Sequence, residues 1–275
     1  MQPGMTNRLL LAAVTMVVGM SCGVGSEISV RGDTKTISYE QFLSVVYQEE
    51  TGEFIANGDD MFEDEVALRR FYDEKIARPE LATTQQALAV YNINGTDIKW
   101  TALQARNLTY CVSSKFGTRH AAVVSAMNAA AAAWEQAGNV DFIHLSAQDS
   151  NCTARNTAVV FNVEPVNVNG QYLARAFFPN TARRSRNIKI DDSSFTLTGD
   201  PTLTGILRHE LGHTIGFRHE HTRPESGACF EDNNWRSLTT YDAASVMHYP
   251  QCNGTGDWSL VLTSRDQSGA RAVYP

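Results

Sequence analysis

Three histidines and one glutamate between residues 209 and 219 have the types and spacing of a catalytic metal site. His209 and His213 are four residues apart, so on a helix both imidazoles lie on one face, about 6 Å apart along the axis. Two such imidazoles can bind one zinc ion. Glu210 can reach a zinc-bound water without being a ligand itself. The spacing therefore predicts zinc on the histidines and a proton-accepting role for Glu210.

A third histidine follows at a spacing that lets it complete the same site. Residues 213–219 read His-x-x-Gly-x-x-His. Glycine accepts the positive φ of a sharp turn, so we expect the helix to end at Gly216 and His219 to approach from another direction. Three neutral imidazoles leave a fourth position open, as in a catalytic zinc site. His221 offers a competing imidazole, but the spacing from Gly216 favours His219. We expect His221 and His248 to be structural.

The elements that must position these residues follow from hydrophobic patterning. An alanine-rich helix is expected over residues 120–136, ended by Gly138. Asp200 and Pro201 have the residue types of an N-cap and a first helical position, so the helix with the histidines should begin there and reach about Ile215. Five strands are expected, at residues 108–113, 140–145, 158–163, 172–178 and 187–191.

Further residues make the pattern specific. The run 209–223 reads H-E-L-G-H-T-I-G-F-R-H-E-H-T-R, and a methionine turn, Ser-Val-Met-His-Tyr, follows at residues 245–249. With Tyr241-Asp242 and the ending 262–274, these residues resemble the astacin family of metzincin peptidases. The resemblance is close over residues 200–275, looser over 106–199 and weak before that.

The resemblance implies an α+β fold, in which a twisted, mostly parallel sheet and two long helices lie above an irregular C-terminal subdomain. It also implies a zinc endopeptidase that acts on proteins or peptides and holds one Zn²⁺ per catalytic domain. Carried over to this sequence, the metal ligands are His209, His213 and His219. Glu210 is the general base, which takes a proton from the zinc-bound water and later gives one to the leaving amine.

Three more residues take roles from the resemblance. Tyr249 resembles the tyrosine that ligates the zinc at rest and swings out to stabilise the oxyanion. Met247 is expected to lie under the zinc as an apolar floor. Glu220 is expected to be a buried partner for an amine or a hydroxyl. A packed tyrosine with a satisfied hydroxyl is the plain alternative for Tyr249.

Charge divides the chain into two parts. The 275 residues carry a net charge of -7, which argues against a nucleic acid partner. Residues 23–105 hold 15 acidic and 7 basic side chains, whereas residues 106–275 hold 15 of each. We expect residues 23–105 to form an acidic, largely helical pro-segment, with helices over 39–48 and 64–77, and residues 106–275 to form the catalytic domain. A solvated acidic face is the plainer alternative.

The first 22 residues have the pattern of an export signal. Arg8 precedes an apolar run of 12 residues, which is shorter than the about 20 residues of a transmembrane helix. Small residues precede Cys22, which resembles a bacterial lipobox, so Cys22 is a lipidation candidate. Plain signal cleavage near Cys22 is the alternative. Either way we expect a protein that is exported, secreted or lipid-anchored at a bacterial cell envelope.

The remaining four cysteines are an even number in an exported chain, which predicts disulfides. Four cysteines allow three pairings. We favour the local one, which joins Cys111 to Cys152 and Cys229 to Cys252. Buried free thiols are the alternative.

The pro-segment also contains a candidate switch. Phe54-Ile55-Ala56-Asn57-Gly58-Asp59 is similar to the Phe-x-Gly-Asp stretch of astacin pro-segments, with two extra residues. The resemblance implies that Asp59 binds the zinc in the precursor and that the pro-segment inhibits its own domain. Asp60 could substitute for Asp59, and a plain Asn-Gly-Asp turn is the alternative.

Two other functions compete with a latent zinc endopeptidase. One is a zinc-stabilised binding or adhesion domain that has lost catalysis, for which Glu210 has no purpose. The other is a metzincin outside the astacins that acts on cell-wall peptides. Acidic pairs at residues 191–192 and 231–232 lack the ligand spacing of a calcium loop.

Overall fold

The computed structural model describes residues 37–76 and 88–275. The predicted export signal, with Cys22, lies outside these residues. Within the described residues, no helix is long and apolar enough to cross a membrane.

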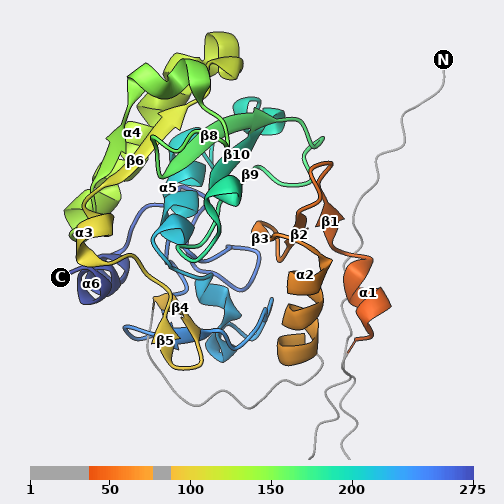
Figure 1. The fold of residues 1–275 in the computed structure, drawn as a ribbon. Helices are drawn as coiled ribbons and strands as arrows, with labels where there is room; N and C mark the ends of the chain where they lie inside the picture. The colour runs from red at the N-terminus through yellow and green to blue at the C-terminus, as the bar shows by residue number, and fades with distance from the viewer. Residues whose placement is uncertain (1–36, 77–87) are drawn as a thin grey trace, which may run out of the picture. The chain divides into compact units, whose positions relative to one another are not determined.

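A five-stranded sheet forms the centre of the fold (Figure 1), in the order β7-β6-β8-β10-β9. Neighbouring strands run parallel except for β9, which pairs antiparallel with β10 at one edge. The mixed architecture predicted from sequence, a mostly parallel sheet with helices, is therefore confirmed. The strands are β6 (Leu108–Val112), β7 (Phe142–His144), β8 (Phe161–Val166), β9 (Ala174–Arg175) and β10 (Asn187–Asp191).

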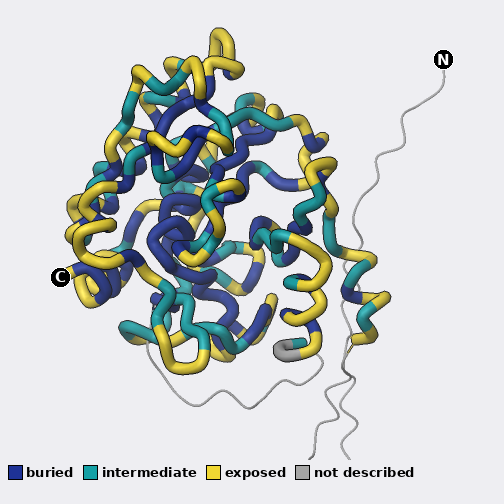
Figure 2. The backbone as a smooth tube through the Cα atoms, in the orientation of Figure 1, coloured by how far each residue is buried: buried dark blue, intermediate teal, exposed yellow. Residues whose placement is uncertain are grey.

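Two long helices pack against one another beside this sheet: α4 (His120–Ala137) and α5 (Leu203–Thr214). Trp134 on α4 is fully buried, donates a hydrogen bond from Nε1 to the carbonyl oxygen of Arg208 at 2.8 Å, and stacks on Phe217. Figure 2 shows that α5 and the segment after it run through the interior, and every residue from 209 to 223 is buried. The histidine-bearing helix is thus held from all sides.

The predicted start of α5 is wrong by two residues. Thr202 is the N-cap, and its side chain accepts a hydrogen bond from the backbone N–H of Gly205 at 3.1 Å. Asp200 and Pro201 precede the helix. Thr202 has the extended backbone and the side-chain oxygen that an N-cap needs, so it takes the position that the sequence assigned to Asp200.

The C-terminal part is mostly irregular, as expected, apart from β11 (Trp235–Ser237) and α6 (Ser264–Val273). Both disulfides are present with the favoured pairing: Cys111 with Cys152 and Cys229 with Cys252. Cys111 and Cys152 are buried with Val159 beside the sheet. Short 3₁₀-helices lie at Ser114–Arg119, Ser146–Asn151, Arg183–Ser185, Asp192–Phe195, Glu220–Thr222 and Pro224–Ser226.

Residues 37–76 form a small unit with its own apolar cluster around Phe42, Leu68 and Phe71. The expected helix over 39–48 ends at Leu43, because residues 47–48 pair with β2 instead. The intervening Val45-Val46 pair is β-branched and favours extended structure. The elements are α1 (Tyr39–Leu43), β1 (Tyr47–Gln48), β2 (Phe54–Ala56), β3 (Asp60–Phe62), α2 (Glu65–Phe71) and a π-helical turn, Tyr72–Ile76. The unit is therefore a mixture of helix and a three-stranded antiparallel sheet rather than largely helical.

Residues 88–105 pack with the residues that follow them. Leu88, Val90 and Trp100 belong to the main core. β4 (Ala89–Ile93) pairs with β5 (Thr96–Asp97) and with β11, and α3 (Ala102–Ala105) leads into β6. The charge distribution predicts a boundary between pro-segment and catalytic domain at residue 105. In the fold, residues 88–105 share the core of residues 106–275.

Gly216 ends α5 in the manner that the sequence predicts. Its φ is +97°, and a Cβ built there would overlap the carbonyl oxygen of Ile98. The turn lets Phe217 form an antiparallel bridge with Val90, which directs the chain back toward the site. Only glycine fits this backbone and this space.

Gly216→Ala should lower the free energy of unfolding by about 3 kcal/mol, since it adds overpacking to a positive-φ cost of about 1–2 kcal/mol. Gly95→Ala is the matched control, because Gly95 has φ +82° and nothing within 4 Å of its added Cβ. Gly95→Ala should lower the free energy of unfolding only by the cost of the positive φ. Urea unfolding followed by tryptophan fluorescence measures both, and equal losses would contradict the role given to Ile98.

Candidate metal centre

Helix α5 and the turn after it bring the three predicted histidines to one point. His209 and His213 project from α5, His219 follows the turn, and all three are buried. Their ring centroids are 4.8–5.1 Å apart. The Nε2 atoms of His209 and His219 are 3.2 Å apart.

Each of these rings uses its Nδ1 to hold its orientation. The acceptors are the carbonyl oxygens of Val246, 2.7 Å from His209, and Phe217, 2.8 Å from His213, and Oε1 of Glu231, 2.5 Å from His219. These oxygens carry no hydrogen, so the hydrogen lies on Nδ1 of each ring and the neutral ring has a lone pair on Nε2. The three Nε2 atoms lie close together at one position, so the arrangement suits a bound cation. Burial opposes protonation of His219, but Glu231 and Asp59 outweigh burial and raise its pKa well above the ordinary value, so this ring holds a proton when no metal is bound.

Asp59 completes the cluster from the turn between β2 and β3. Its Oδ1 is 3.0 Å from Nε2 of His219, and its Oδ2 is 3.3 Å from Nε2 of His209 and 3.6 Å from Nε2 of His213. Burial opposes ionisation of this carboxyl, but His219 and His213 outweigh burial and hold its pKa well below the ordinary value. An ionised carboxylate therefore faces the three imidazoles.

The four side chains fit a tetrahedral zinc ion. Ligand atoms about 2.0–2.1 Å from such an ion are about 3.3–3.4 Å from one another, close to the separations of 3.0–3.6 Å found here. Nε2 of His213 and Oδ1 of Asp59 are buried and have no hydrogen-bond partner among the described residues. Burial also lowers the pKa of His209 to about 4, which keeps that ring neutral and able to bind a metal.

Glu210 is buried beside the histidines, and its Oε2 has no hydrogen-bond partner among the described residues. Burial raises the pKa of this carboxyl well above the ordinary value, and the negative charge of Asp59 raises it further. A carboxyl with a raised pKa and a free oxygen can both accept and return a proton near neutral pH. The role of Glu210 as the base stays a prediction from sequence.

Tyr249 lies against the histidines, with ring centroids 5.4 Å from His209 and 4.6 Å from His219. Burial, and then the carboxylates of Asp59 and Glu210, raise the pKa of its hydroxyl well above the ordinary value, so the hydroxyl keeps its proton. Gly58 packs on this ring: its φ is +103°, and an added Cβ would lie 3.0 Å from the Tyr249 hydroxyl oxygen. The residue before Asp59 must therefore be small for Asp59 to enter the site.

Met247 is fully buried below the histidines. It packs on α5 at Gly212, where an added Cβ would overlap its Sδ. The backbone carbonyl oxygen of Met247 accepts a hydrogen bond from the N–H of Glu220 at 2.8 Å. The methionine turn thus supports both the helix and the segment that carries His219.

His221 and His248 are engaged in hydrogen bonds outside the cluster. Nε2 of His221 is 3.0 Å from Oε1 of Glu231, and its Nδ1 accepts the backbone N–H of Tyr249 at 3.1 Å. Nε2 of His248 is 2.6 Å from the Tyr241 hydroxyl. The contacts of His221 orient Tyr249 through its backbone.

The sequence does not predict that Glu231 belongs to this site. In the sequence, Glu231 and Asp232 stand out only as an acidic pair without the ligand spacing of a calcium loop. Glu231 bonds to both His219 and His221, and its Oε2 is 3.0 Å from Nη2 of Arg218. Arg218 also pairs with Asp60, at 3.0 Å, and with Asp232, at 2.9 Å. Asp60 therefore points to Arg218 and Asp59 to the histidines. The one sequence signal for Glu231 is its position two residues after Cys229, inside a disulfide loop.

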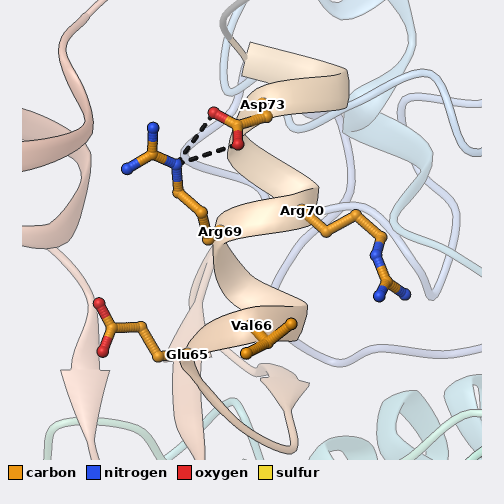
Figure 3. A pocket seen from close by; sticks show the side chains of 5 residues that line it. All are labelled: Glu65, Val66, Arg69, Arg70 and Asp73. Carbon is orange, nitrogen blue, oxygen red and sulfur yellow. Dashed lines mark hydrogen bonds and ion pairs between the residues drawn. The ribbon is translucent and has the colours of Figure 1, made fainter.

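A shallow surface hollow lies elsewhere, on α2 (Figure 3). It is lined by Glu65, Val66, Arg69, Arg70 and Asp73. Its side chains come from α2 and from the π-helical turn directly after it, and Arg69 and Asp73 are paired with each other at 3.0 Å. This hollow contains none of the histidines and does not form part of the metal centre.

Comparison with known proteins finds similarity to metallopeptidases. Residues 99–228 match the family model described as matrixin. The chain is 33% identical over 83 residues to "zinc metalloproteinase nas-30" of Caenorhabditis elegans, a match that covers 23% of this chain and 11% of the relative. It is 36% identical over 89 residues to "bone morphogenetic protein 1 homolog" of Strongylocentrotus purpuratus, which covers 24% of this chain and 14% of the relative. The chain thus spans a small fraction of these relatives.

Among solved structures, myroilysin is similar at 17% identity with a TM-score of 0.47, over 68% of this chain and 98% of that chain.

Glu231→Gln should weaken zinc affinity by about 10- to 100-fold, as loss of an acceptor behind a metal-binding histidine does. Competition with a chelator of known zinc affinity measures the change. Glu225→Gln is the control, because Glu225 pairs with Arg223 in the same loop and touches none of the three histidines in the described contacts. Equal zinc affinity in the parent and the Glu231 variant would contradict the role of Glu231.

Proposed function

The chain carries a domain of the astacin-like zinc metallopeptidases, and on that premise we propose that it is a zinc endopeptidase made as a latent precursor. The observation that carries the proposal is the meeting of three imidazoles and one carboxylate from residues 37–76 at one buried point. Helix α5 also carries a buried glutamate, Glu210, whose Oε2 has no hydrogen-bond partner among the described residues. His209, His213 and His219 would hold one zinc ion. Within the predicted pro-segment, residues 23–105, it is residues 37–76 that reach the site. Pro-segment below means residues 37–76, because residues 88–105 share the main core.

Each group near the metal has a distinct task in peptide hydrolysis. Zinc supplies a Lewis acid that polarises the peptide carbonyl and makes water more acidic. Glu210 accepts a proton from the attacking water and delivers it to the leaving nitrogen. The Tyr249 hydroxyl, which keeps its proton, donates a hydrogen bond to the oxyanion of the substrate once Asp59 has left. His221 positions Tyr249 through the backbone N–H at 3.1 Å.

Asp59 is the basis of latency in this proposal. It takes the fourth ligand position, where a water or a substrate carbonyl would otherwise bind. Two neighbours support it: Asp60 pairs with the buried Arg218, and Gly58 packs on Tyr249. The pro-segment therefore blocks the metal position and the oxyanion donor with consecutive residues.

The buried carboxyl of Glu210 favours an enzyme over a zinc-stabilised binding domain. Burying a carboxyl oxygen without a hydrogen-bond partner costs about 1–3 kcal/mol or more. A binding domain gains nothing from that cost, whereas a general base must keep an acceptor free for water. The alternative of a metzincin that acts on cell-wall peptides uses the same residues and differs only in substrate.

Peptide substrates and export complete the proposal. Two disulfides are typical of proteins that leave the reducing cytoplasm. Secretion, with or without a lipid on Cys22, follows from residues 1–22 and stays a prediction from sequence.

Glu210→Gln should keep one zinc per chain and lower kcat/KM by about 10²- to 10⁴-fold, because it keeps the shape of the side chain and removes the base. Zinc content and cleavage of an unfolded protein substrate are measured on the protein processed from the full chain. Glu225→Gln serves as the control. If the Glu210 variant binds zinc and cuts as well as the parent, the general base is another residue.

Asp59→Ala should raise the activity of the uncleaved chain about 10-fold or more, since it removes a charged contact of about 1.5–3 kcal/mol that holds the closed state. Activity is measured while electrophoresis verifies that the chain is intact. Asp73→Ala is the control, because Asp73 pairs with Arg69 on the exposed face of α2. Unchanged activity at unchanged zinc content would show that Asp59 is not the block.

A further inference from the structure

A second carboxylate of the pro-segment, Glu49, is bound by cationic side chains of the sheet. Its Oε1 is 2.7 Å from Nε of Arg175 and 2.5 Å from the Tyr172 hydroxyl. Its Oε2 is 2.9 Å from Nη2 of Arg175 and also accepts a hydrogen bond from Nζ of Lys189. Both oxygens of one carboxylate are thus held by a bidentate arginine, a lysine and a tyrosine.

The receptor for this carboxylate is built by the edge of the central sheet. Arg175 on β9 and Lys189 on β10 are direct cross-strand partners, so their side chains lie on the same face of the sheet. Arg175 is fixed further by Asn187, whose Oδ1 accepts from Nη1 at 2.7 Å. Ile55 packs against Val168 and Tyr172 at the border of the receptor. The Thr51 hydroxyl also donates to Oε2, at 3.3 Å, from the same segment as Glu49, whereas the charged groups that bind the carboxylate, Arg175 and Lys189, belong to the catalytic part.

Charge makes this receptor dependent on an anion. The side chains of Arg175 and Lys189 are 0% and 10% exposed, and one carboxylate lies between them. Burial opposes ionisation of Glu49, but Arg175 and then Lys189 outweigh burial and lower its pKa to about 2. Once the pro-segment leaves, two positive charges and the Tyr172 hydroxyl remain without their anion, in a site shaped for a carboxylate.

We propose that Arg175, Lys189 and Tyr172 form a substrate subsite that binds an acidic side chain of the cleaved peptide after the pro-segment leaves. The inference rests on the proposed peptidase function and adds a substrate class to it: peptides with Glu or Asp at one defined position. Glu49 occupies the subsite in the precursor, as Asp59 occupies the metal position. An arginine that binds both carboxylate oxygens distinguishes an acid from its amide, because the amide nitrogen cannot accept.

The distance to the metal sets where the acidic residue must lie. The backbone N–H of Glu49 bonds to the carbonyl oxygen of Glu53 at 2.8 Å, and Glu53 precedes Asp59 by six residues. Six extended residues span at most about 20 Å. β9, which carries Arg175, packs against α5, which carries Glu210, so the subsite lies on the side of the sheet edge that faces the helix of the base. The acidic residue should therefore lie within six positions of the bond that is cut.

The test uses enzyme processed from the full chain and a set of peptides that differ only in Glu, Gln or Ala at one position. Each position within six residues of the cut bond is examined. We expect one position at which kcat/KM is about 10- to 100-fold higher for Glu than for Gln, as one charged hydrogen-bond network provides. Arg175→Gln and, separately, Lys189→Gln should bring this ratio toward one. Arg184→Gln, at an exposed arginine of the same part, should leave the ratio unchanged.

The outcomes separate this inference from the proposed function. Cleavage of peptides with equal rates for Glu and Gln at every position would overturn the subsite and leave the peptidase intact. If no peptide is cut although zinc is bound, the peptidase proposal fails, and equilibrium binding of the Glu and Gln peptides by calorimetry then decides the subsite. Equal binding overturns it, and tighter binding of the Glu peptide that is lost in both variants supports it. If the Arg175 variant does not fold, the Lys189 variant alone still tests the subsite.

Discussion

The structure depends on three imidazole lone pairs that meet at one buried point. Each ring is held with its Nδ1 bonded to an oxygen that cannot donate, so no hydrogen of a neutral ring separates the three Nε2 atoms. Such an arrangement suits a bound cation, and the protein must hold it in place by other interactions. The packing of α5, the turn at Gly216 and the acceptor oxygens can be understood as supports for this point.

These supports come from parts of the chain that are distant in sequence. Val246 and Met247 belong to the methionine turn, Glu231 to a disulfide loop, and Trp134 to the opposing helix α4. A ligand position accurate to a few tenths of an ångström requires that each ring be restrained on several sides. The burial of every residue from 209 to 223 therefore serves the geometry of the site as well as the stability of the core.

Residues 37–76 contact the catalytic part through buried charges and through a small apolar cluster, in which Ile55 packs against Val168 and Tyr172. Asp59 faces the histidines, Asp60 pairs with Arg218, and Glu49 pairs with Arg175. All three carboxylates are buried against positive or metal-binding groups, and none of these contacts depends on a large shared apolar surface. A segment that binds in this way can leave without exposing the main core, which suits a removable inhibitor. When this segment leaves, a substrate can bind at two positions that the segment occupied: the metal position and the pair of cations, Arg175 and Lys189.

Local pattern was sufficient to predict the histidines, the glutamate between them, the methionine turn, the disulfide pairing and most strands, because each depends on spacing along one short segment or on residue type. The roles of Glu231, Arg175 and Lys189 depend on contacts between segments more than ten residues apart. The end of α1 at Leu43 depends on the pairing of β1 with β2, and the start of α5 at Thr202 depends on which of two nearby residues caps the helix. Glu231 is 2.5 Å from His219, and Arg175 is 2.7 Å from Glu49, although neither has a distinctive sequence neighbourhood. Only the folded chain brings these charges together, since the burial that makes a charge need a partner does not exist until the segments have packed.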